Sequence, residues 1–146
     1  MLEVIIQETK VGEKEYVLVK CQKISPELSD LLDQIRDYDR ALIAFTGNET
    51  HRINPSDVFY VESVDKKIFI YCENIVYESK ERLYEFEEML NPNVFMRISK
   101  STIVNLSKVK SVSIALYGRL SLTLTNGEKV FVTRTHVDRL RGKLEL

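Results

Sequence analysis

Residues Phe95–Leu106 read Phe-Met-Arg-Ile-Ser-Lys-Ser-Thr-Ile-Val-Asn-Leu, two apolar runs around a short polar centre. The apolar residues on both sides are expected to enter a protein core, whereas Ser99, Lys100 and Ser101 are expected to project hydrogen-bond donors outward. Hydroxyl groups, lysine side chains and backbone N–H groups are the usual contacts to phosphate. The segment therefore predicts a strand-rich domain with a turn suited to a polyanion.

The charge of the chain changes sign close to this segment. From residue 91 onward the sequence holds ten Lys/Arg and three Asp/Glu, a balance of +7, and residues 1–90 hold eleven and nineteen, a balance of −8, which together give the net −1. Lys and Arg release condensed counterions from phosphate, so a basic final third suits nucleic acid. Uneven charge over solvated faces is the alternative, and charge alone does not decide between them.

Length and composition predict a soluble globular protein. A chain of 146 residues can form one domain with a real core, or a small module plus an appendage. No apolar run approaches the roughly 18 residues that a membrane span needs, and the first residues lack the basic and apolar regions of a signal peptide. We therefore expect a cytoplasmic protein that does not insert into the membrane.

The sequence gives little support for an enzyme or a metal site. Ser99, His136 and Asp138 could in principle form a triad, but no nucleophile elbow or oxyanion motif accompanies them. The five glycines form no phosphate-binding loop. Cys21 and Cys72 lie in apolar runs and are expected to pack as small hydrophobic residues. We expect no catalytic residue, no metal and no cofactor.

Residues 1–40 are predicted to form a β-β-α extension. Leu2–Glu8 and Tyr16–Cys21 are rich in Val, Ile and Leu and flank a turn at Gly12, which indicates a hairpin. Ser25 and Pro26 suit the N-cap and the first position of a helix that ends near Tyr38. Its apolar stripe is Leu28, Leu31, Leu32 and Ile35. Its outer face is acidic, with Glu27, Asp30, Asp33 and Asp37.

Residues 41–146 are predicted to be mainly β with one amphipathic helix. That helix is expected over Ser79–Leu90, capped by Ser79 and stopped by Asn91-Pro92. Asn126-Gly127 is a strong hairpin signal, and Val64–Lys67 is expected to form a hairpin tip that carries lysines. The expected strands are Ala41–Phe45, Thr50–Ile53, Val58–Ser63, Ile68–Cys72, Ile75–Tyr77, Val109–Leu116, Leu120–Thr125 and Lys129–Thr133.

Several blocks of this region, in order and spacing, resemble the LytTR domain, a DNA-binding module of bacterial transcription regulators. Ser99–Leu106 is similar to the His-Arg-Ser-x-Leu-Val-Asn stretch of that family. The other blocks are Asp57–Glu62, Leu83–Leu90, Phe95–Arg97, Leu122–Gly127 and Val132–Arg134. The resemblance covers roughly Ala41–Leu144. It implies an elongated, mostly β LytTR-type fold in which loops, and not a recognition helix, enter DNA.

The resemblance also implies three DNA-contacting loops. The outer two would reach successive major grooves, and the middle one would lie over the minor groove between them. The implied contact residues are Lys66 and Lys67 in the first loop, Ser99, Lys100 and Ser101 in the second, and Arg134, Thr135 and His136 in the third. An arginine can pair with guanine in a bidentate manner, so Arg134 is the expected base reader.

Some positions depart from the family or have another explanation. Ser99 and Lys100 replace the family's His and Arg, and lysine lacks the planar fork of arginine. Arg97 is expected to form a structural ion pair with the acidic helical segment Glu85–Glu88. Solvated surface charge is the alternative for Lys66, Lys67, Lys100 and Arg134.

The last expectations concern the role of residues 1–40 and the binding partners of the protein. Forty residues cannot build the receiver domain that many family members carry, so the chain resembles the stand-alone branch. We expect a homodimer on double-stranded DNA with paired short sites, with residues 1–40 serving dimerisation or a protein partner. The alternative is a protein-interaction module on a LytTR scaffold that binds a membrane or sensor protein. RNA binding would need exposed aromatic pairs, which the sequence does not suggest.

Overall fold

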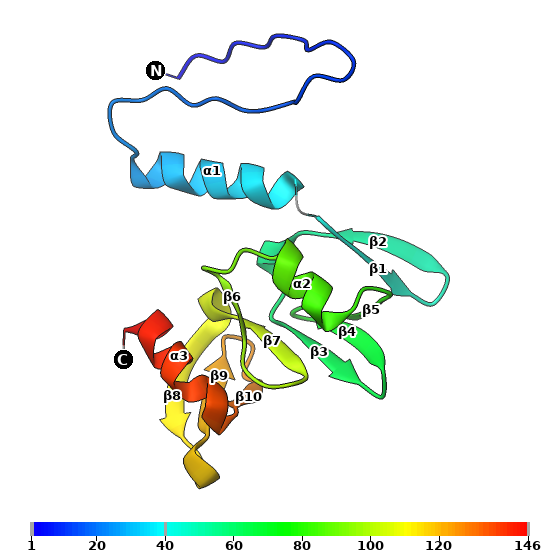
Figure 1. The fold of residues 1–146 in the computed structure, drawn as a ribbon, viewed down its shortest axis with the longest axis vertical. Helices are drawn as coiled ribbons and strands as arrows, with labels where there is room; N and C mark the ends of the chain where they lie inside the picture. Colours follow the sequence, from blue (N-terminus) through cyan, green and yellow to red (C-terminus); the bar gives the residue numbers. More distant parts are fainter. Residues whose placement is uncertain (1, 40, 146) are drawn as a thin grey trace.

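The computed structural model describes residues 2–39 and 41–145 (Figure 1). In that part of the chain there are three α-helices, α1 (Pro26–Asp39), α2 (Leu83–Met89) and α3 (Arg134–Leu144), and ten strands. The strands are β1 (Leu42–Thr46), β2 (Glu49–Ile53), β3 (Tyr60–Val64), β4 (Lys67–Tyr71), β5 (Val76–Ser79), β6 (Phe95–Arg97), β7 (Thr102–Asn105), β8 (Val109–Ile114), β9 (Leu120–Leu124) and β10 (Lys129–Val132). The predicted mainly β fold is confirmed.

The strands form two antiparallel sheets. The larger has seven strands in the order β2-β1-β5-β4-β3-β7-β6, and the smaller has three in the order β10-β9-β8. Two pairings place the functional region. In the β3–β4 hairpin Val64 lies opposite Lys67, and β3 also pairs with β7, where Glu62 lies opposite Thr102. Because β3 and β7 are antiparallel, the end of β3 lies next to the start of β7.

Strands β3, β6 and β7 are buried on both faces. Successive strand residues point to opposite faces, so Val61 and Ile103 enter one core with Phe86 of α2. Their neighbours Tyr60 and Val104 enter a second core, which the small sheet and α3 complete. This arrangement explains why apolar residues are adjacent at Phe95-Met96 and at Ile103-Val104, because a strand covered on both sides buries both of its faces.

Two tyrosines mark the second core. The rings of Tyr60 on β3 and Tyr71 on β4 stack with their centroids 4.2 Å apart. Burial raises the pKa of both phenols above the usual range, and a hydrogen bond to Glu128 adds to the effect on the pKa of Tyr60. Both hydroxyls therefore stay protonated at neutral pH.

The predicted strands at Leu2–Glu8 and Tyr16–Cys21 are wrong. Residues 2–24 have no assigned strand and run as an exposed out-and-back trace, blue in Figure 1. The turn itself is present, since the Glu13 N–H donates to the Lys10 carbonyl at 3.1 Å. Cys21 is exposed rather than packed. The chain by itself supplies no core for these apolar residues, so burial cannot stabilise a sheet here.

The helix predicted after Ser25 is confirmed as α1. The Ser25 Oγ accepts the Leu28 N–H at 3.1 Å, as expected for an N-cap. On its apolar stripe Leu28, Leu32 and Ile35 are half-buried, and Leu31 is exposed. The side chain of Asp37, predicted to lie on the acidic face, falls outside the described residues.

Two predictions about helices in residues 41–146 need correction. Ser79 does not cap α2, because it is the last residue of β5, paired with Ile68, and α2 begins only at Leu83 after an Arg82 N-cap. In addition α3 is a second helix, in a region that was expected to follow the last strand as a loop. None of the helices in the described part of the chain is long and apolar enough to cross a membrane.

Candidate nucleic-acid interface

Three loops lie side by side at one edge of the molecule. We call Val64–Lys67 loop 1, Ile98–Ser101 loop 2 and Thr133–His136 loop 3, and together the three-loop surface. The Ser63 N–H, just before loop 1, donates to the Ser101 carbonyl at 2.8 Å. The Thr133 N–H and hydroxyl both donate to the Ile98 carbonyl, at 2.9 and 3.2 Å. Loop 2 is therefore hydrogen-bonded to both of its neighbours.

Loop 1 is a tight hairpin turn with a lysine at its tip. Asp65 and Lys66 have positive φ angles of 50° and 65°, the pattern of the type I′ turn that matches strand twist. Lys66 is exposed at the centre of the turn. Lys67 is the first residue of β4, and its Nζ lies 3.9 Å from the Glu78 Oε1. Lys66 is thus the lysine at the exposed tip of the loop.

Loop 2 holds its polar residues in a compact turn. The Ser101 N–H donates to the Ser99 Oγ at 3.2 Å, and the two hydroxyls are 3.4 Å apart. Lys100 sits between them and is exposed, with no acidic side chain within salt-bridge distance among the described residues. The turn therefore presents an uncompensated ammonium group between two serine hydroxyls, a combination suited to a phosphate.

Arg97 connects loop 2 to α2. Its Nη1 donates to the Lys100 carbonyl at 3.0 Å, and its Nη2 lies 2.9 Å from the Glu87 Oε1. The predicted ion pair with the acidic helix is confirmed. The guanidinium is only about one-fifth exposed, so this charge-assisted pair is better protected from water than a surface salt bridge. Arg97 therefore positions the loop rather than facing a ligand.

Replacing Arg97 with Met is expected to loosen loop 2. The change removes the bond to the Lys100 carbonyl and leaves Glu87 unpaired, and hydrogen bonds to charged groups contribute about 1.5–3 kcal/mol. We expect a loss of that order in the free energy of unfolding, measured with urea, and faster hydrogen exchange at the Ser101 amide. The same change at Arg139, an exposed residue of α3, is the control. Exchange that is equally fast in both variants would show that Arg97 does not brace the loop.

Loop 3 differs from its prediction, because Arg134 is the first residue of α3 and does not lie on a loop. Thr133 is the N-cap residue, and its hydroxyl lies 2.8 Å from the His136 Nδ1. The Thr135 hydroxyl lies 3.2 Å from the same nitrogen. Half-buried His136 therefore fixes the start of the helix, while Arg134 and Thr135 are exposed.

The position of Arg134 is not explained by helix stability. A cation at the N-terminus of a helix opposes the helix dipole, which favours anions there. The side-chain stem of Arg134 lies over Gly118, where an added Cβ would be 3.4 Å from the Arg134 Cγ and Cδ. Gly118 has φ +74°, so the chain both turns and leaves room at this point. Arg134 therefore holds its cationic side chain over Gly118 at a position that does not favour the helix.

Of the predicted site residues, most are brought together and two serve a different role. Lys66, Lys100, Ser99, Ser101, Arg134 and Thr135 belong to the three-loop surface with exposed or half-buried side chains, whereas Lys67 is engaged by Glu78 and His136 by two hydroxyls. Thr133 and Gly118 were not among the residues predicted for the site. A signal for Thr133 existed, because it precedes Val137, Leu140 and Leu144 at helical spacing.

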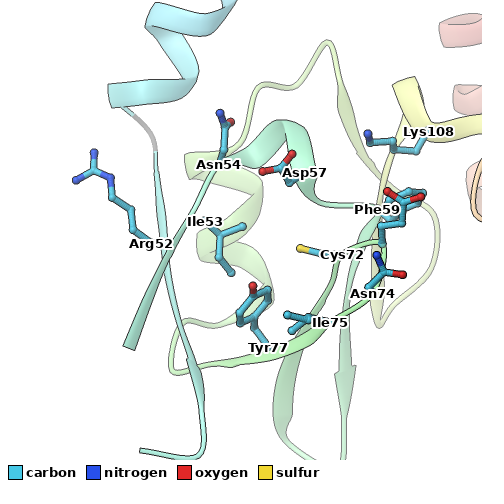
Figure 2. A pocket seen from close by; sticks show the side chains of 11 residues that line it. Arg52, Ile53, Asn54, Asp57, Phe59, Cys72, Asn74, Ile75, Tyr77 and Lys108 are labelled. Atoms are coloured by element: carbon cyan, nitrogen blue, oxygen red, sulfur yellow. The ribbon is translucent and has the colours of Figure 1, made fainter. Parts of the chain in front are cut away.

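A cavity of about 320 Å³ lies elsewhere (Figure 2). It is formed at the ends of β2, β4 and β5, so it lies at the opposite end of β4 from loop 1. Burial raises the pKa of the Cys72 thiol in its wall to about 11, with a smaller contribution from Asp57. The thiol is therefore neutral at physiological pH, and its half-buried packing against the first core confirms the expectation for Cys72. The described residues include no cluster suited to a metal ion.

Comparison with known proteins identifies the family of this fold. The family model of the LytTr DNA-binding domain matches residues 48–145. A solved LytTr DNA-binding domain from Bacillus cereus superposes with a TM-score of 0.70 and 28% identity, over 73% of this chain and 97% of that one. Proteins described as uncharacterized HTH-type transcriptional regulators of Staphylococcus aureus, strains NCTC 8325 / PS 47 and MRSA252, are 26% identical over 135 residues, 91% of each chain.

The architecture is that of the matched domain rather than of a helix-turn-helix. Strands separate α1 from α2 and α2 from α3, so no two helices follow each other directly among the described residues. The chain belongs to the LytTR DNA-binding domain family.

Proposed function

We propose that this protein is a transcription regulator that binds specific sequences of double-stranded DNA through the three-loop surface, in the cytoplasm. The observation that carries the proposal is the hydrogen bonding of loop 2 to both neighbouring loops. It supports a surface in which Lys66, Lys100 and Arg134 keep fixed relative positions, as the reading of several grooves by one rigid domain requires. Family membership and the relatives described as transcriptional regulators support the same function.

Each loop has its own role in this proposal. Arg134 reads a base edge in the major groove, because its planar fork can donate two hydrogen bonds to guanine. Lys66 neutralises phosphates at the other outer groove. Lys100, between the two, lies over the minor groove, where negative potential attracts a cation. Ser99 and Ser101 fix the register of loop 2 on the sugar-phosphate backbone.

Lys100→Ala is expected to weaken binding to every duplex and to flatten its salt dependence. Each neutralised phosphate contributes about 0.9 to the slope of log K against log salt on duplex DNA. We expect the slope to fall by about one, measured by fluorescence anisotropy on a random duplex over a series of salt concentrations. Lys100→Arg keeps the charge and should keep the slope. An unchanged slope in Lys100→Ala would remove loop 2 from the phosphate contacts.

A protein contact is the second candidate function, favoured by one observation. The apolar residues of the N-terminal extension are exposed to solvent. This candidate does not compete with DNA binding, because the extension and the three-loop surface are built from different residues.

A further inference from the structure

The extension holds most of the large hydrophobic residues whose side chains are exposed. Of twenty large hydrophobic residues with exposed side chains in the described part of the chain, eleven lie between Leu2 and Leu31. Ile6 is 86% exposed and Val4 82%. Soluble monomers rarely leave such a contiguous apolar surface open, and it usually marks an interaction site.

The turn defines how the two arms of the extension would pair. The Glu13 N–H donates to the Lys10 carbonyl, and the Lys10 N–H to the Glu13 Oε2, both at 3.1 Å. Extending this register outward places Ile6 opposite Val17. Antiparallel partners have their side chains on the same face. In the half of the hairpin away from the turn, one face would therefore consist only of apolar residues. That face consists of Leu2, Val4, Ile6, Val17, Val19 and Cys21.

The opposite face of the same hairpin is mixed. There Glu3 falls opposite Lys20, an oppositely charged cross-strand pair, Ile5 falls opposite Leu18, and Gln7 falls opposite Tyr16. Sorting of apolar residues onto one face is the pattern of a half-buried antiparallel sheet. A register shifted by one residue would exchange the two faces of one arm and place Lys20 on the face of Leu2, Val4 and Ile6.

A single chain cannot complete this sheet. Gly12 has φ +91° while Val11 is not among the residues with positive φ, so the turn has the type II pattern, which splays the strands. Apart from the turn, no backbone hydrogen bond joins residues 2–9 to residues 14–20, all of which the structure describes. An isolated two-stranded hairpin is at best marginally stable in water. A second apolar layer must come from outside the chain.

We propose that two copies of this chain dimerise through the extension, with the apolar faces of their hairpins packed together. Full burial of an aliphatic side chain removes about 60–120 Å² from water. The six residues of the face would therefore bury roughly 400–700 Å² in each copy. Ile24 and Leu31 extend the surface, which brings it close to the ~800 Å² per partner of a stable interface.

Charge favours a second copy over an anionic partner. Residues 1–24 contain four acidic and four basic residues, so two hairpins do not repel each other. Residues 25–40 contain five acidic and two basic residues, and this balance disfavours an anionic lipid surface or DNA. A twofold interface needs one surface that is complementary to itself, which an uncharged apolar face provides.

The extension lies outside the segment that the family model matches, but most of it lies within the segment that aligns with the Staphylococcus aureus relatives. The family model begins at residue 48. The Staphylococcus aureus match covers 91% of the chain, and the remaining 9% of 146 residues is only about 13 residues. Most of residues 1–40 therefore lies within that match. A dimer formed through this segment would hold two three-loop surfaces for paired sites on DNA.

The test is the mass of the full chain in solution, measured by sedimentation equilibrium without DNA. A dimer gives 34.0 kDa, twice the 17.0 kDa of the chain. Val17→Glu places a charge on the apolar face, opposite Ile6, and should give the monomer mass. Val11→Glu is the control, because Val11 is fully exposed in the turn between the arms, and it should remain dimeric. Far-UV circular dichroism checks that both variants stay folded.

Two results would overturn this proposal. One is a wild-type chain with the monomer mass, and the other is a dimer that survives Val17→Glu. The proposal does not rest on DNA binding, because the measurement contains no DNA. A monomer that still binds specific DNA would overturn only the dimer, and a dimer that binds no DNA would overturn only the proposed function.

Discussion

Arg134→Ala is expected to weaken binding to the specific operator by about 1–3 kcal/mol, roughly 5- to 150-fold, and to change binding to random duplex little. The reason is the position of the guanidinium. It is exposed at the first residue of α3 and lies over Gly118, next in sequence to Thr133, which is hydrogen-bonded to loop 2. A bidentate arginine–guanine contact contributes discrimination of about this size. Competition anisotropy with operator and scrambled duplexes measures both affinities.

The control for Arg134 is Arg36→Ala. Arg36 is an exposed arginine of α1, outside the domain that the family model matches, and its loss removes the same charge. It should leave both affinities nearly unchanged. Equal weakening of operator and scrambled duplex by Arg134→Ala would mean that this residue contacts only phosphate, and base reading would then have to be assigned to another loop.

Leu140→Ala is expected to reduce the free energy of unfolding by about 2–5 kcal/mol, the usual range for a buried leucine. Leu140 is fully buried and anchors α3 on the second core. Its truncation leaves a cavity beneath the helix whose first residue is Arg134. Since α3 carries loop 3 into the three-loop surface, specific DNA binding should fall together with stability. Urea unfolding followed by circular dichroism measures the first effect.

Leu116→Ala is the matched control for stability. Leu116 is 73% exposed in a short turn, so its truncation removes little buried surface and should change the free energy of unfolding by less than about 0.5 kcal/mol. A loss below 1 kcal/mol in Leu140→Ala would show that α3 is not held by the core. The second core would then not fix the position of Arg134, the first residue of α3.

Much of the fold could be predicted because local patterns and tertiary packing agree in this chain. The continuous apolar runs around loop 2 predicted strands, and the structure buries them on both faces. The hairpin with its tip at Val64–Lys67 was predicted from the two strand-like runs that flank it, and the tip adopts the positive φ angles that a two-residue loop needs. The ion pair of Arg97 was predicted from charge, because the helical segment Glu85–Glu88 offers several acidic partners for this one arginine, and the structure has the pair with Glu87.

The failures have physical causes in particular residues. The arms of the extension have strand composition, but strand propensity measures fit to a half-buried surface, and one copy of the chain offers no such surface. Ser79 has a side chain suited to capping a helix, but it pairs with Ile68 and therefore belongs to strand β5. α3 was missed because a short helix with three core residues and a glycine has a weak periodic signal. The hydrogen bonds from Thr133 to Ile98 join residues 35 positions apart, which no local pattern predicts.

The central claim, that the three-loop surface reads DNA sequence, is tested most directly by selecting bound sequences from a random duplex library at about physiological salt, where non-specific binding is weak. The expected result is enrichment of two short motifs about one helical turn apart, with the enrichment lost in Arg134→Ala and kept in Arg36→Ala. Recovery of no motif by a folded wild-type protein, or of the same motif by Arg134→Ala, would contradict this account.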